Sequence, residues 1–174
     1  LVLVLHATAN YGSLSIAVCQ ARCLMKKPVV LITGTSSGIG LATAVQAAQN
    51  GFTVVATMRD TKKSHPLLNA ATAAHVDVEV LEMDVVSQNS ISACVSQVME
   101  THGRLDAVVN NAGAAHIGTI ENESMDAIRT VMEVNYFGVV ALTRIALPHL
   151  RSSRGCLITI SSVVTASTNP GQII

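Results

Sequence analysis

One stretch of the sequence decides the fold: Pro28-Val29-Val30-Leu31-Ile32-Thr33-Gly34-Thr35-Ser36-Ser37-Gly38-Ile39-Gly40. Its apolar run, its three glycines and the amphipathic pattern that follows predict a buried strand leading through a tight turn into a helix. The free backbone N–H groups and the dipole at such a helix N-terminus favour an anionic group. We therefore expect this turn to bind a group such as a pyrophosphate.

Strand and helix patterns alternate along the rest of the chain. The strands predicted from apolar runs are 29–33, 52–57, 76–81, 105–109 and 155–160. The helices predicted from amphipathic stretches are 38–49, 67–74, 87–102 and 123–150. Alternation of this kind gives βαβ units with right-handed crossovers. The expected fold class is α/β, a Rossmann-type doubly wound parallel sheet.

Composition agrees with that fold and narrows the range of partners. The 174 residues suit one domain, and eleven basic and eleven acidic residues give a formal net charge of zero. This balance shows no footprint for nucleic acid or for a membrane surface. Hydrophobic residues make up 49% of the chain, with two Phe, two Tyr and no Trp, which suits strands buried on both faces.

The cysteines and the first residues carry no separate function. Cys19, Cys23, Cys94 and Cys156 are not completed by other residues into a metal-ligand set, so we expect ordinary thiols, no metal and a cytoplasmic location. Residues 1–24 lack the basic region of a secretory signal and the length of apolar chain that a membrane span needs. We expect them to be an extension outside the fold, and we expect residues 25–174 to form a partial Rossmann-type domain.

The glycines of the turn suit close approach of a ligand. Gly34 allows a tight turn, Gly38 lets the backbone approach the ligand, and Gly40 lets the helix pack on the strand. A glycine triplet alone is a weak signal, because many strand-to-helix turns contain one. Its place between an apolar strand and an amphipathic helix favours nucleotide binding.

The end of the second strand bears on which nucleotide binds. An acidic residue there would hold a ribose 2′-OH, whereas a nearby Arg accommodates a 2′-phosphate. The sequence reads Met58-Arg59-Asp60, and a guanidinium suits a phosphate, so NADP(H) is favoured over NAD(H). Two alternatives remain open: Arg59 is a solvated loop charge, or Asp60 turns back to bind NAD.

Three motifs together resemble the short-chain dehydrogenase/reductase family over residues 28–174: residues 33–40, Asn110-Asn111-Ala112-Gly113, and Ile160-Ser161-Ser162-Val163. The match is to its compact single-domain branch. The resemblance implies a set of residues around the pyrophosphate and the adjoining ribose: Gly34, Ser36, Ser37, Gly38, Ile39 and Gly40. It also implies that Asp84 and Val85 border the adenine, and that Asn111, Ala112 and Gly113 bind along the cofactor and brace the sheet.

The same resemblance implies two active-site residues. Asn135 matches the asparagine of this family whose backbone supports a water in a proton relay. Ser162 matches the catalytic serine, whose hydroxyl would hydrogen-bond the substrate carbonyl as negative charge develops. Without the resemblance, Asn135 would read as an exposed helix residue and Ser162 as a turn or helix cap.

One motif of the family does not occur in these residues. Its general acid/base is a Tyr in Tyr-x-x-x-Lys, but the tyrosines here are Tyr11 and Tyr136, and every lysine precedes residue 64. By the family's spacing the missing Tyr would fall at or just beyond Ile174. We therefore expect a chain cut before this motif, without its C-terminal strands, and severely impaired in turnover.

The expected function is hydride transfer between NADP(H) and a carbonyl/alcohol substrate. Residues 56–60 and 134–140 resemble hydroxysteroid- and retinol-dehydrogenase-like members, which hints at a bulky, apolar substrate. The helix 123–150 resembles one that the family uses to pair subunits, so a homo-oligomer is possible. One alternative is a non-catalytic dinucleotide-binding or regulatory protein. A second alternative is a methyltransferase that uses S-adenosylmethionine on a similar α/β sheet. Such an enzyme would need an acid at the end of the second strand, so Met58-Arg59 at this position argues against it.

Overall fold

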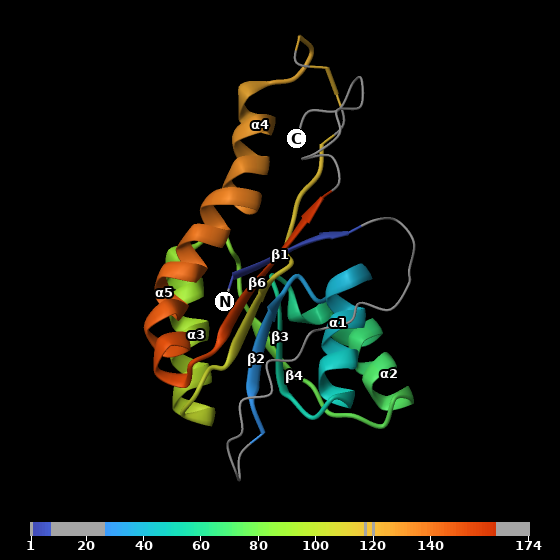
Figure 1. Cartoon of the computed structure of the whole chain (residues 1–174). Coiled ribbons are helices and arrows are strands. Elements are labelled where there is room, and N and C mark those ends of the chain that lie inside the picture. The colour runs from blue at the N-terminus through green and yellow to red at the C-terminus, as the bar shows by residue number, and fades with distance from the viewer. Residues whose placement is uncertain (1, 8–26, 117, 120, 163–174) are drawn as a thin grey trace.

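A single parallel sheet forms the centre of the computed structural model, which describes residues 2–7, 27–116, 118–119 and 121–162 (Figure 1). Its strands run in the order β1-β6-β5-β2-β3-β4, and each neighbouring pair is parallel. The strand bounds are β1 Val2–Ala7, β2 Val29–Thr33, β3 Thr53–Met58, β4 Glu79–Glu82, β5 Ala107–Asn110 and β6 Cys156–Ser162. The predicted α/β fold class with a doubly wound parallel sheet is confirmed.

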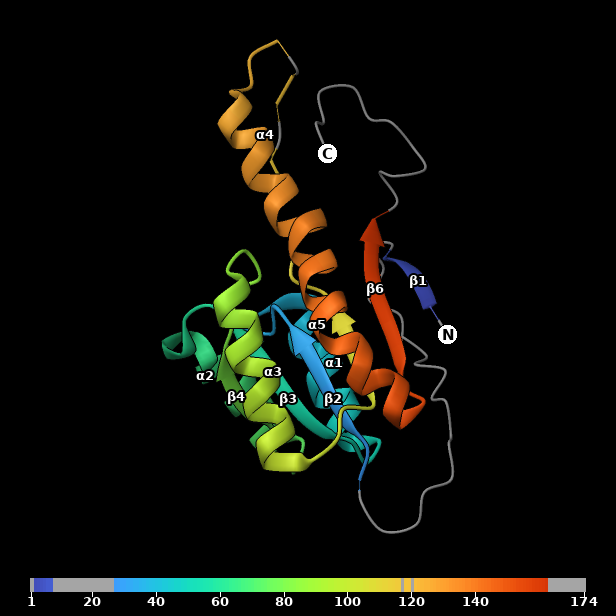
Figure 2. The same ribbon diagram turned by 90° about the vertical axis from the view of Figure 1, so that its left-hand side faces the viewer.

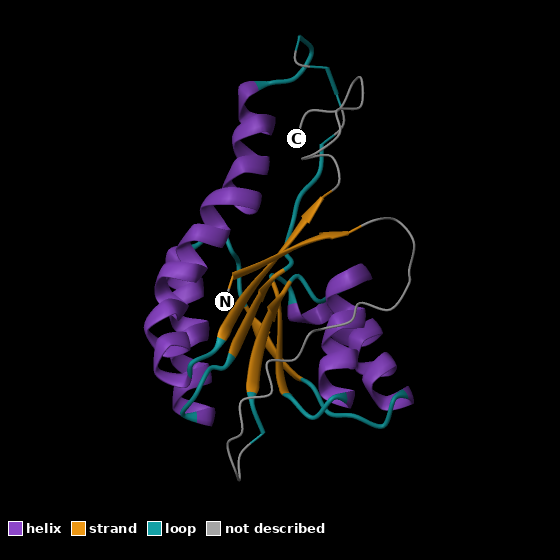
Figure 3. Cartoon of the chain, in the orientation of Figure 1, coloured by secondary structure: helices purple, strands orange, loops and turns teal. Residues whose placement is uncertain are grey.

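Helices cover both faces of this sheet (Figure 3). Their bounds are α1 Gly38–Gln49, α2 His65–Ala73, α3 Gln88–His102, α4 Met125–Met132 and α5 Gly138–Ser153, with a 3₁₀ turn η1 at Thr61–Ser64 and a π-helical segment η2 at Glu133–Phe137. In Figure 1, α1 and α2 lie on one side of the sheet, and α3 and α5 lie on the other. Figure 2 shows α4 projecting beyond the end of the sheet to which the β6 arrow points.

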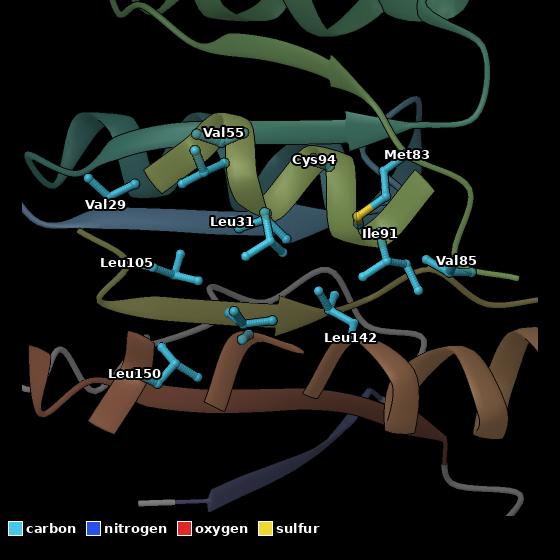
Figure 4. Close-up of a cluster of buried hydrophobic side chains, with 14 residues drawn as sticks. Val29, Leu31, Val55, Met83, Val85, Ile91, Cys94, Leu105, Leu142 and Leu150 are labelled. Atoms are coloured by element: carbon cyan, nitrogen blue, oxygen red, sulfur yellow. The ribbon is translucent and has the colours of Figure 1, made fainter. Parts of the chain in front are cut away.

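Each face of the sheet has its own apolar core. On the α3/α5 side, alternate residues of the strands, among them Leu31, Val55 and Val108, pack against Leu142 and other side chains of these helices (Figure 4). On the other side, the intervening strand residues pack against α1 and α2. Strands buried on both faces account for the continuous apolar runs in the sequence.

The strand order changes direction between β2 and β5. From β2 the chain continues through β3 to β4 on one side, whereas β5 and β6 lie on the other side. Ligands of open α/β sheets bind in the crevice outside the carboxyl ends of the strands at such a switch point. The turn after β2 and the turn after β5 therefore meet at the place where a nucleotide is expected.

The prediction that residues 1–24 lie outside the fold is wrong for residues 2–7. These residues form β1, which runs parallel to β6, with Val2 opposite Leu157 and Ala7 opposite Ser162. The outer edge of β6 presents backbone groups that need partners, and an extended apolar segment can supply them. Residues 8–24 lie outside the described part of the chain.

The predicted single helix 123–150 is divided. α4 begins at Met125, η2 interrupts the regular helical hydrogen bonding, and α5 continues to Ser153. By length and composition alone, residues Met125–Ser153 could cross a membrane, a test that core helices of soluble proteins also pass. The α5 part buries Leu142, Ala146 and Leu150 in the core beside the sheet. Packing on the sheet therefore accounts for the apolar residues of α5, whereas Met125, Tyr136 and Phe137 of α4 and η2 are exposed.

Candidate functional site

The N-terminus of α1 has an unfilled cap. Ser37 occupies the N-cap position, but its side chain accepts no hydrogen bond from the first turn. By contrast, Ser87 accepts a bond from the amide of Ser90 at the start of α3, and Ser124 accepts one from the amide of Ala127 at the start of α4. The first-turn amides of α1 thus keep their capacity to bind an external acceptor such as a phosphate oxygen.

Two glycines allow the turn to pack tightly against the chain after β5. Gly34 has φ +68°, and a Cβ added there would lie 2.8 Å from the Cα of Ala112. A Cβ on Gly40 would overlap the carbonyl oxygen of Gly34 and the side-chain amide of Asn111. At Gly38, by contrast, an added Cβ meets nothing within 4 Å. The turn is closed toward β5 and open at Gly38, the position assigned to close approach of the ligand.

Thr33 and Asn111 join the two turns at the switch point. The Thr33 hydroxyl oxygen accepts hydrogen bonds from the amides of Asn111 (2.9 Å) and Ala112 (2.8 Å). In return, the Asn111 side-chain amide donates to the carbonyl oxygens of Thr33 (2.8 Å) and Gly34 (3.0 Å). This reciprocal set places the Asn111 side chain in the bracing position predicted for it. Gly113 follows at the surface.

Three threonines that were not expected from the sequence fix this turn. Besides Thr33, the Thr35 hydroxyl donates to the Thr57 carbonyl (3.1 Å), and the Thr57 hydroxyl donates to the Ile32 carbonyl (3.1 Å). All three threonines are buried. Polar residues inside an otherwise apolar strand are a signal for such a role, because buried hydroxyls need partners. Ser36, Ser37 and Ile39 lie between these anchors and the helix, partly or fully exposed to solvent.

Arg59 and Asp60 lie just after β3 and differ in what their side chains do. The Asp60 carboxylate accepts a hydrogen bond from the backbone amide of Lys62 (3.0 Å) and caps η1. Arg59 is exposed, and no ion pair holds it within the described residues. Lys62 and Lys63 are exposed beside it. The end of β3 therefore presents a cluster of positive charge, while its one carboxylate is engaged locally.

Asp84 and Val85, predicted beside the adenine, follow β4 in a turn. The Asp84 side chain accepts a hydrogen bond from the Val86 amide (3.2 Å), and its backbone amide donates to the Ser90 hydroxyl (2.9 Å). The Val85 side chain is buried in the core on the α3/α5 side. The Val85 side chain is therefore part of the core and does not face a ligand at the surface.

Asn135 lies within the π-helical segment η2. Its side-chain oxygen accepts from the Ala114 amide (2.8 Å), and its side-chain nitrogen donates to the Ala114 carbonyl (2.8 Å). The side chain thus ties the helix to the loop after Gly113. Because π-helical segments leave the regular helical ladder, they are common at functional sites. The placement is compatible with a role for the Asn135 backbone, since the side chain is used elsewhere.

Ser162 is the last residue of β6 and is exposed at its carboxyl end. Because β5 and β6 are parallel neighbours, Ser162 lies on the same edge of the sheet as the Asn111 turn. In the loop after that turn, His116 Nε2 lies 2.6 Å from Glu123 Oε2. The predicted site residues therefore gather along one edge.

No cluster of three or more metal-ligating side chains occurs among the described residues. Cys94 is buried in α3, and burial, with a smaller contribution from the charge of Glu79, raises the pKa of its thiol from 9.0 to about 11. Such a thiol is a poor nucleophile near neutral pH. Cys94 therefore adds no reactive thiol to the edge described above.

The chain is similar to known proteins of one family. A family model described as short chain dehydrogenase matches residues 28–174. Retinol dehydrogenase 8 of Homo sapiens is 41% identical over 140 residues, which cover 78% of this chain and 44% of that protein. Estradiol 17-beta-dehydrogenase 1 of Rattus norvegicus is 41% identical over 133 residues, covering 73% of this chain and 38% of that protein. The chain thus spans less than half the length of these curated relatives.

Solved structures resemble the fold closely. An alcohol dehydrogenase from the archaeon Thermococcus sibiricus, complexed with 5-hydroxy-NADP, matches with a TM-score of 0.78 at 28% identity, over 84% of this chain and 63% of that chain. A short-chain dehydrogenase from Streptomyces avermitilis matches with a TM-score of 0.76 at 32% identity, over 84% of this chain and 53% of that chain.

Proposed function

We propose a function for this chain on the basis of its family, because the chain belongs to the short-chain dehydrogenase family. Members of this family are oxidoreductases that use a nicotinamide dinucleotide. The proposed function is binding of NADP(H) along the carboxyl edge of the sheet, for hydride transfer to or from a carbonyl/alcohol substrate. The main support is the pair of hydrogen bonds that joins the turn after β2 to the turn after β5 at the switch point. The Asn111 amide donates to the Thr33 hydroxyl, and the Asn111 side chain donates to the Thr33 carbonyl.

The residues present fit the dinucleotide. The unfilled cap of α1 offers amide donors to a pyrophosphate, and the open space at Gly38 lets that group approach the backbone. When bound, the cofactor supplies the hydride. The proposed contribution of Gly34, Gly40 and Asn111 is to hold the turn in the shape that accepts it.

The charges after β3 favour NADP(H) over NAD(H). An acid that binds a ribose 2′-OH must point toward it. The Asp60 carboxylate instead caps η1, where its Oδ1 accepts a hydrogen bond from the Lys62 amide. Arg59 has no ion-pair partner within the described residues, and a guanidinium can donate two parallel hydrogen bonds to a phosphate. Of the two open alternatives, the local engagement of Asp60 weighs against NAD.

Ser162 is proposed to hydrogen-bond the substrate oxygen and Asn135 to support a water through its backbone. Both assignments rest on the family motif and on their places at the carboxyl edge of the sheet. The two named relatives act on retinol and estradiol by name, so we propose a bulky, apolar alcohol or ketone as the substrate. A homo-oligomer through residues 123–150 and a cytoplasmic location remain part of the proposal.

Proton transfer needs a group that these 174 residues do not provide, since neither tyrosine has a lysine four residues later. General acid–base help is worth roughly 10²–10⁴-fold in rate. A polypeptide of these 174 residues is therefore expected to bind the cofactor and to turn over slowly.

The experiment is a titration of the full chain with NADPH and NADH, followed by the fluorescence of the reduced nicotinamide. Arg59→Gln is expected to raise the Kd for NADPH by roughly 10- to 100-fold, the loss of one charged hydrogen-bonding group, and to leave the Kd for NADH unchanged. Arg129→Gln removes the same charge from an exposed site on α4 and serves as the matched control.

Three outcomes separate the parts of the proposal. No binding of either nucleotide would contradict the dinucleotide site itself. Equal weakening of NADPH and NADH by Arg59→Gln would contradict the assignment of the 2′-phosphate to Arg59. Tighter binding of NADH than of NADPH by the unaltered chain would reverse the proposed cofactor preference.

A further inference from the structure

The side chain of Asn110 carries a buried polar group that lacks a partner among the described residues. Among the residues that the structure describes, the side-chain nitrogen of Asn110, the last residue of β5, has no hydrogen-bond partner, and the residue is only 3% exposed. A buried amide donor without a partner costs stability, and the great majority of buried polar groups are paired. The Asn110 amide therefore calls for an acceptor.

The surroundings of Asn110 place it at a fork between two strands. Asn110 lies opposite Thr159 of β6, and this is the last pair of the β5–β6 ladder. Beyond it, the chain after β5 turns to β2 through Asn111, whereas β6 continues to Ser162. Two strands that separate leave between them backbone and side-chain polar groups that no longer bind each other.

Both side chains of this last pair lie on the α3/α5 face of the sheet. Side chains alternate along a strand, and Val108 of β5 and Leu157 of β6 both pack on the core of that face. Asn110 and Thr159, two residues further along each strand, share their side. An amide and a hydroxyl thus lie side by side at the end of an otherwise apolar layer, where Asn110 is buried and Thr159 is half-buried.

We propose that a single buried water occupies this fork, accepting a hydrogen bond from the Asn110 side-chain amide and donating one to the Thr159 hydroxyl. Internal waters sit where two or more polar groups would otherwise lack partners, and an apolar cavity would stay dry. The water bridges β5 to β6 where their direct pairing ends. It thereby fixes the separation between the strand that leads to Asn111 and the strand that ends at Ser162.

This hydration site goes beyond the proposed function and does not depend on it. It rests on the burial of Asn110, on the register of β5 and β6, and on the end of their ladder. Cofactor binding could fail in the titration above while the water is present, and the reverse also holds.

The test uses nuclear magnetic resonance of the full, ¹⁵N-labelled chain. The side-chain amide protons of Asn110 are expected to show a cross-relaxation peak with water that has a long residence time. Absence of this peak in the unaltered protein would overturn the proposal, because the amide would then be dry or bound to a protein group.

Two substitutions of nearly the same size at the opposite position sharpen the test. Thr159→Val removes the hydroxyl and keeps the shape, so the Asn110 water peak should disappear and the melting temperature should fall by roughly 2–10 °C. Thr159→Ser keeps the hydroxyl, and the water peak should persist. A water peak that survives Thr159→Val unchanged, or a Thr159→Val protein that is more stable than the unaltered chain, would overturn the proposed bridge.

Discussion

The Thr33 hydroxyl joins the turns after β2 and β5 at the carboxyl edge of the sheet, and Thr33→Val tests this role. The residue is 1% exposed, and its oxygen accepts from the amides of Asn111 (2.9 Å) and Ala112 (2.8 Å). Valine keeps the shape of the side chain but leaves both donors without this acceptor. An unsatisfied buried donor costs about 1–3 kcal/mol, and Asn111 and Ala112 are partly exposed, so we expect a total loss of about 2–4 kcal/mol.

The assay is unfolding in urea followed by circular dichroism, together with NADPH titration of the folded protein. A loss of this size corresponds to a fall in melting temperature of about 5–15 °C for a chain of this length. Thr33→Ser keeps the hydroxyl and loses one buried methyl group, so it should cost only about 1 kcal/mol. If Thr33→Val were as stable as Thr33→Ser, the Thr33 hydroxyl would not be the acceptor that holds the two turns together.

Further predictions follow from single contacts. Gly40→Ala should abolish NADPH binding in the titration, because the new Cβ meets the Gly34 carbonyl and the Asn111 amide, whereas Gly38→Ala, in open space at φ +60°, should fold with a loss of only about 1 kcal/mol. Asp106→Ala should lower the free energy of unfolding in urea by about 2–3 kcal/mol, because the carboxylate accepts from the Val29 amide (2.8 Å) and from Arg104 Nε (2.7 Å); unchanged stability would contradict this role. Because the pKa of the Cys94 thiol is raised from 9.0 to about 11 in the folded state, stability should fall as pH rises from about 9 through 11, and Cys94→Ala should flatten that part of the stability profile.

Local signals in the sequence predicted the elements that lie around the site. The strand 29–33 and the helix 38–49 were predicted with the bounds that the structure has, because an apolar run stops at a glycine turn and Asn50-Gly51 ends the helix. The start of α3 was likewise marked by Ser87 as a cap. In these cases, the residues that determine an element lie within it or beside it.

The features that sequence reasoning missed depend on partners far along the chain. Thr33 binds amides 78 and 79 residues away, and nothing in its own neighbourhood indicates them. The break of the long helix at η2 accompanies the bonds between Asn135 and Ala114, which lie 21 residues apart. The motifs gave the positions of Asn111 and Ser162 on the edge, but not the set of hydrogen bonds that holds this edge together.

The place of β1 in the sheet has a consequence for the order of folding. Among the described residues, β1 pairs with β6 alone, with Val2 opposite Leu157, so its partner lies at the far end of the described chain. Contacts between such distant segments form slowly, because a long loop must close before they give any gain. The five strands from β2 to β6 pair with one another without contribution from β1, which lies at the edge of the sheet. The N-terminal strand should therefore dock last, on a sheet that is already formed.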